Sequence, residues 1–129
     1  MAKRLTLIGF IGLLIVGLSC KKSTESSATL TGKIILSQCG TAVIQIDGAS
    51  GTGGGVVWAN GGVSYSNAAT IGNYCYLKGL GIRAGDIVSF KTVVTNPQPN
   101  ASCIVELCLI AIPQPKSVIY VTDMVKTGP

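Results

Sequence analysis

The sequence contains no histidine, and only 12% of its 129 residues are charged. Histidine is the commonest general base near neutral pH and the commonest metal ligand, so its absence removes the usual basis for both kinds of site. The acidic residues beyond the N-terminal region, Asp47, Asp86, Glu106 and Asp123, are isolated along the chain, and their spacing predicts no carboxylate pair for glycoside hydrolysis. We therefore expect no catalytic residues, no metal and no cofactor, and we predict that the protein is not an enzyme.

Basic residues are equally dispersed. From residue 29 onward the chain has six basic and four acidic residues, which gives this part a net charge of +2. A protein that binds nucleic acid by neutralising phosphates needs its basic residues gathered on one face. Because these six residues are scattered singly, we expect no nucleic-acid partner.

The chain also lacks an apolar run long enough to cross a membrane as a helix. Lys3 and Arg4 precede an apolar run of 14 residues, 5–18, whereas a membrane-spanning helix needs about 20. A charged start followed by a short apolar run is typical of a secretory signal peptide. We predict that residues 1–19 are such a signal peptide.

The junction Gly17-Leu18-Ser19-Cys20 resembles the lipobox of bacterial lipoproteins. In that family the cysteine thiol is alkylated with diacylglycerol before cleavage just ahead of it, which implies that Cys20 is the lipid-bearing first residue of the mature chain. Gly17 stands where the family usually has leucine, and Leu18 where it usually has a small residue. The alternative is an ordinary signal peptide cut near Ser19, which would leave Cys20 as a free thiol.

Residues 20–28 comprise this cysteine and a polar stretch without apolar periodicity, which indicates a flexible tether. Residues 29–129 are enough for one domain, which we expect to be a monomer. Lys21, unlike an aspartate at this second mature position, provides no inner-membrane retention signal of the enterobacterial kind. The lipoprotein resemblance therefore implies a lipid anchor in the cell envelope, with the outer membrane favoured.

Four cysteines, Cys39, Cys75, Cys103 and Cys108, lie within the predicted domain. A signal peptide leads to a compartment in which disulfides persist, so we expect two bridges in one of three connectivities. A bond between Cys103 and Cys108 is disfavoured, because an extended chain separates their Cα atoms by about 16 Å and a disulfide needs about 5.5 Å. A zinc site is the less favoured alternative, because structural zinc sites prefer closer pairs of cysteines.

Alternation of apolar and polar side chains predicts strands over residues 29–37, 42–47, 70–77, 86–95 and 117–122. In the strand over 86–95, Phe90 and Val94 share the face toward the core. Residues 102–112 are almost continuously apolar, which predicts a strand buried on both faces. No convincing helix follows residue 28. Residues 48–55 are rich in glycine, but no lysine follows them, so a flexible connector is favoured over a phosphate-binding loop.

The pair Asn60-Gly61 lies between two short apolar runs and predicts a β-hairpin, because a type I′ turn needs positive φ at both central residues. Trp58 and Tyr65 would then lie near each other across the two strands. These aromatics are candidate contacts for a sugar or a peptide, although such pairs more often serve packing. Exposed rings would favour a binding role, and buried rings a structural one.

Five or six short antiparallel strands around one core predict an all-β fold, a small closed or partly open barrel. The strand beginning Thr31-Gly32-Lys33-Ile34, the strands that follow it and the segment 82–90, with Gly85-Asp86 turning into a strand, resemble an OB-fold barrel of the kind found in small secreted lipoproteins. An immunoglobulin-like β-sandwich is the alternative.

Two functions follow from these expectations. The first is a lipid-anchored binding module that presents its loops, chiefly residues 48–69, to an envelope protein, a glycan or a small ligand. The second is a structural envelope lipoprotein with no dedicated ligand. The fold alone selects neither, because folds of this type carry many functions.

Overall fold

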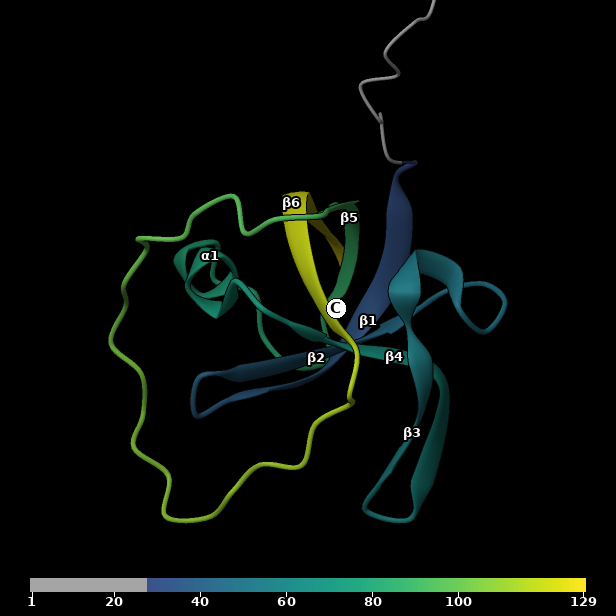
Figure 1. Ribbon diagram of the computed structural model, residues 1–129, viewed down its shortest axis with the longest axis horizontal. Helices are drawn as coiled ribbons and strands as arrows, with labels where there is room; N and C mark the ends of the chain where they lie inside the picture. Colours follow the sequence, from purple (N-terminus) through teal and green to yellow (C-terminus); the bar gives the residue numbers. More distant parts are fainter. Residues whose placement is uncertain (1–27) are drawn as a thin grey trace, which may run out of the picture.

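The computed structural model describes residues 28–129, which fold into six strands, one short α-helix and one turn of 3-10 helix (Figure 1). The predicted signal peptide, Cys20 and residues 21–27 of the tether lie outside the described residues. The elements in chain order are β1 (Leu30–Gln38), β2 (Thr41–Ile46), η1 (Thr52–Gly54), β3 (Val56–Asn60), β4 (Val63–Ile71), α1 (Tyr74–Gly79), β5 (Ile87–Val93) and β6 (Val118–Gly128).

Five of the strands close into a ring. β1 pairs with β2 on one side and with β5 on the other, β2 also pairs with β4, and β5 pairs with β6, all antiparallel. A parallel pairing of β4 with β6 completes the circle, and β3 pairs with β4 alone. The predicted all-β, OB-fold-like barrel is thus confirmed in place of two separate sheets. The expectation of purely antiparallel pairing is wrong at β4 and β6.

The alternating residues of the ring fill one core. Phe90, Ile34, Ile44 and Val88 are completely buried there, as the period-2 pattern of their strands predicts. Phe90 is the largest of the fully buried side chains. The single core explains why the strands stay paired, since each contributes its inward face to the same apolar cluster.

The strand predicted over 70–77 is wrong beyond Ile71, where β4 ends and the helix α1 follows. At Gly72 an added Cβ would lie 2.5 Å from the ring of Tyr120, so only glycine fits this close approach. The side-chain amide of Asn73 then donates to the carbonyl of Val121 (2.7 Å) and accepts from its N–H (3.0 Å). Because the amide takes the place of a strand neighbour for β6, the main chain is released into a helix.

The buried strand predicted over 102–112 is also wrong. These residues form no strand and lie in the connection between β5 and β6. Every strand of the ring already has a neighbour on both sides, so no place in the ring is left for a further strand. β5 ends at Val93, and Val94, expected on the core face, is 85% exposed.

Candidate functional site

The connection between β5 and β6, residues 94–117, is called the long loop here. Figure 1 shows it as a wide excursion from the barrel, on the side of α1 and the turn between β1 and β2. Two disulfides fix it. Cys75 of α1 bonds to Cys103 with a Cα–Cα distance of 5.5 Å, and Cys39 of the turn bonds to Cys108 at 5.7 Å.

These bridges confirm two expectations, that the four cysteines form disulfides and that Cys103 and Cys108 bond elsewhere. The reason given for the second expectation, an extended strand between Cys103 and Cys108, is wrong, because this segment is irregular. No cluster of three metal-ligating side chains occurs among residues 28–129.

The most unusual surface of the described residues is the outer side of the long loop. Ile104, Leu107, Leu109 and Ile110 are 88%, 94%, 99% and 78% exposed. Single exposed apolar residues are normal on a protein surface, but a contiguous group of large ones marks a contact surface for a protein or a membrane. We call residues 107–112 the apolar tip, which begins one residue before the bridge at Cys108.

The long loop carries two charged residues, Glu106 just before the apolar tip and Lys116 near the start of β6. Glu106 is its only charged residue between Thr92 and Pro115, and it lines a shallow hollow together with Lys78 and Arg83. The ammonium group of Lys78 also donates to the carbonyl of Ile104. This carboxylate therefore lines the same hollow as two cationic side chains, and the apolar tip carries no charge.

Val105 is less exposed than the apolar residues around it, at 42% against 88% for Ile104 and 94% for Leu107. A Cβ added at Gly40 would lie 2.8 Å from a methyl group of Val105, so this side chain packs on the turn between β1 and β2. Gly40 also has a positive φ of 75°, which glycine adopts without strain. The contact of Val105 with Gly40 and the bridge at Cys108 thus hold the loop against the turn, with the apolar tip outward.

A second surface is the β3–β4 hairpin, which projects from the barrel in Figure 1. Trp58 pairs with Tyr65 as predicted, and their rings stack with centroids 5.6 Å apart. The turn lies one residue later than predicted, with positive φ at Gly61 and Gly62. Both rings are half-buried because each covers the other, so their exposure fits neither of the two outcomes expected for a binding and a structural role.

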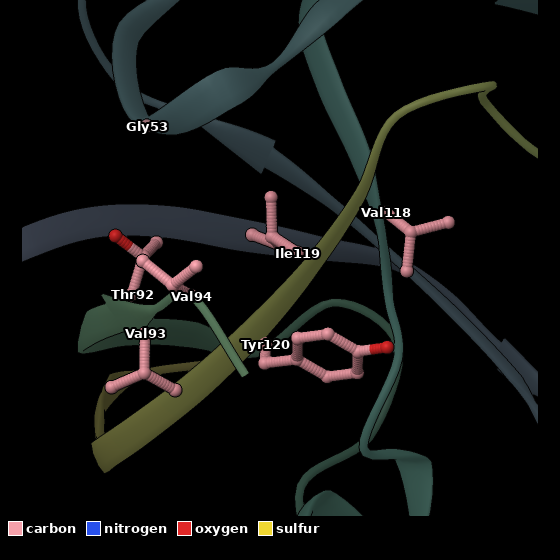
Figure 2. A pocket seen from close by; sticks show the side chains of 7 residues that line it. All are labelled: Gly53, Thr92, Val93, Val94, Val118, Ile119 and Tyr120. Atoms are coloured by element: carbon pink, nitrogen blue, oxygen red, sulfur yellow. The ribbon is translucent and has the colours of Figure 1, made fainter. Parts of the chain in front are cut away.

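A third surface is a cavity of about 470 Å³ where β5 ends and β6 begins. Figure 2 shows Thr92, Val93, Val94 and Ile119 on one side of the β6 ribbon, with Val118 and the ring of Tyr120 on the other. Gly53 of η1 completes the lining, and no charged side chain contributes to it. The cavity adjoins the two ends of the long loop and adds apolar surface there.

The Gly-rich connector before β3 is anchored rather than loose. Asn67, completely buried on β4, accepts a hydrogen bond from the N–H of Gly51 and donates to the carbonyls of Ile46 and Thr52. The amide of Asn67 is therefore already hydrogen-bonded to the backbone and is not available to a phosphate, unlike the free N–H groups of a phosphate-binding loop.

Among the three surfaces, sequence reasoning found the Trp58–Tyr65 hairpin and missed the apolar tip. The signal for the tip was the apolar run 102–112, which was assigned to the interior. Within the described residues no helix is long and apolar enough to span a bilayer. Comparison with protein-family models, curated proteins and solved structures found no match to this chain.

Proposed function

We propose that this protein is a monomeric, lipid-anchored, non-catalytic binding module of the cell envelope, held at the outer membrane through Cys20. The apolar tip of the long loop is its contact surface. The observation that carries this proposal is the nearly complete exposure of Leu107, Leu109 and Ile110 on a loop fixed by two disulfides.

Fixing such a loop favours binding because the entropy of ordering it is lost on folding rather than on contact. The exposed leucines and isoleucine of the tip do not stabilise the barrel, because none of them belongs to its core cluster. Their exposure favours a binding module over a purely structural lipoprotein, which has no need of an apolar outer loop. The absence of histidine and of paired carboxylates supports a role without catalysis.

The proposal is tested by a photo-reactive amino acid introduced at Leu109 of the full-length protein in its native cells. The control position is Val125 on β6, which is apolar and 58% exposed but lies at the other end of β1 from the Cys39 bridge, because it pairs with Ser89 and Ser89 pairs with Thr31. We expect adducts of defined mass from position 109, lost when Leu107 and Ile110 are changed to serine, and none of the same mass from position 125. Equal adducts from both positions, or none from either, would contradict a dedicated contact surface.

A further inference from the structure

We propose that the apolar tip inserts into the interface of the bilayer that holds the anchor, so that the polypeptide makes a second, direct contact with the membrane. This inference rests on the proposed function in two respects, because it takes the same loop as the contact surface and the same lipid anchor at Cys20. It goes further by naming the lipid surface as the occupant.

The composition of the tip suits a lipid surface. From Leu107 to Pro115 the chain carries no charged side chain, and Leu107, Leu109 and Ile110 point away from the barrel, as their exposure shows. Lys116 follows the uncharged stretch and is exposed, and Lys78 lies at the other end, bonded to Ile104. Apolar side chains bordered by lysines are typical of segments that lie in the membrane interface.

The backbone sets how deep the tip can go. No backbone–backbone hydrogen bond involves residues 102–114 among the described residues. Unpaired peptide groups are excluded from the hydrocarbon interior but remain hydrated among the headgroups. Insertion is therefore limited to the boundary of headgroups and acyl chains, about 5–10 Å deep, with Glu106 left outside beside Lys78 and Arg83.

The reach of the predicted tether allows the tip to contact the membrane that holds the anchor. Nine residues, 21–29, span at most about 30 Å when fully extended. The tip is bonded to Cys39 at the far end of β1, and a strand of this length is about 30 Å long. The tether can therefore let the barrel lie with its tip on the bilayer, and tethering raises the local concentration of membrane around it.

The orientation that follows is distinctive. Val125 lies at the opposite end of β1, because it pairs with Ser89, which pairs with Thr31 next to the tether. If the barrel stood upright on its tether, Val125 would be nearer the bilayer than Leu109. Insertion of the tip reverses this order.

The test uses the full-length lipidated protein reconstituted in vesicles of phosphatidylethanolamine and phosphatidylglycerol with brominated acyl chains, which quench tryptophan on contact. Trp58, the only tryptophan, is first changed to phenylalanine. Leu109→Trp and Val125→Trp are then compared in this background, and thermal unfolding of each variant verifies the fold. We expect quenching at position 109 to exceed that at position 125 about threefold, as interfacial insertion requires.

Adding Leu107→Ser and Ile110→Ser should reduce quenching at position 109 to the level at position 125. Quenching at 109 that is equal to or weaker than that at 125 overturns the inference. If this occurs while photo-adducts with a protein still form at position 109 in cells, the membrane contact is wrong and the proposed binding module stands. If the adducts are also missing, both proposals fail.

Discussion

The buried side-chain amide of Asn67 fixes the backbone of the connector between β2 and β3. Asn67 bonds to Gly51 at 3.1 Å, to Ile46 at 3.3 Å and to Thr52 at 3.0 Å. Gly55 is pressed against the same side chain, so a Cβ there has no room. Polar groups buried without partners are costly, and the buried side chain of Asn67 satisfies its own amide while bonding one buried and two partly buried backbone groups.

We expect Asn67→Leu to lower the free energy of unfolding by about 1–3 kcal/mol, because it leaves the buried carbonyl of Ile46 and two partly buried groups without their partner. Asn67→Asp is the matched variant, since it keeps the acceptor for Gly51 and loses both donor hydrogens. Urea denaturation measures both. A midpoint within error of the parent for both variants would show that the connector needs no anchor.

Asp86 makes the stability of the fold depend on pH. It accepts a hydrogen bond from the N–H of Arg83 (2.9 Å) and lies 3.2 Å from the ammonium of Lys126. The bond from Arg83 first, and then Lys126, hold the pKa of this carboxyl below its usual value against an opposing effect of burial. A lowered pKa in the folded state stabilises the fold above the unfolded pKa, about 3.9, and this contribution is lost as the pH falls through the folded value.

Asp86→Asn should therefore unfold at a lower temperature than the parent at pH 7. The difference in unfolding temperature between parent and variant should stay constant down to about pH 5. It should then shrink as the pH falls below the ordinary pKa of an aspartate, about 3.9. Thermal unfolding from pH 7 to pH 2.5 measures it. A gap that is unchanged at the acid end would assign the effect to packing rather than to charge.

At the scale of elements, the two bridges of the long loop differ in the length of chain that each closes. The residues joined are 69 apart for Cys39–Cys108 and 28 apart for Cys75–Cys103. In the chain-entropy account a longer closed segment restricts the unfolded state more. Both bridges also hold the loop against the barrel, one at the turn after β1 and one at α1.

We expect Cys39→Ser/Cys108→Ser to cost about 4 kcal/mol, and Cys75→Ser/Cys103→Ser to cost about 1 kcal/mol less. The midpoint of urea unfolding compares them. Limited proteolysis should also cut the first variant fastest within the apolar tip, because Cys108 adjoins it. A larger loss from the shorter bridge would show that α1, rather than chain entropy, governs the effect.

The elements that sequence analysis predicted are those whose side chains alternate against one core. β1, β5 and the start of β6 follow this pattern, and Phe90 lies in the core as expected. The β3–β4 hairpin was predicted instead from its glycine turn. The helix α1 was missed because Tyr74, Cys75 and Tyr76 suit a strand locally, and only the distant bonds of Asn73 to Val121 end β4 before them.

The candidate site was predicted in part for a related reason. Trp58 and Tyr65 are neighbours across one short turn, so their pairing follows from local sequence. Exposure of the apolar tip depends on the ring being closed by β6, which comes later in the chain. A run of leucine and isoleucine has the same composition whether it is buried in a core or exposed on a loop, and only the tertiary structure distinguishes these two cases.

At the scale of the whole molecule, the proposed anchor and the proposed contact surface adjoin opposite ends of β1. The predicted tether precedes the start of β1 in the sequence, and the disulfide of the apolar tip follows its end. Among the described residues, the buried cluster runs from Ile34 to Met124, with Leu30 packed against it. The anchor should therefore determine where the domain is held, and the loop what it contacts.

Changing Cys20 tests this division. Cys20→Ala should abolish metabolic labelling with a fatty acid and block cleavage at this site, because the thiol is the group that a lipoprotein precursor must alkylate. The barrel should still fold, because its core cluster is built from described residues between Ile34 and Met124, and alkylation of the denatured, unreduced protein should find no free thiol. Cys39→Ser/Cys108→Ser is the control, which should weaken the barrel and keep the label. An ordinary signal peptide predicts the opposite: a parent protein without label, and a Cys20→Ala variant cleaved as efficiently as the parent.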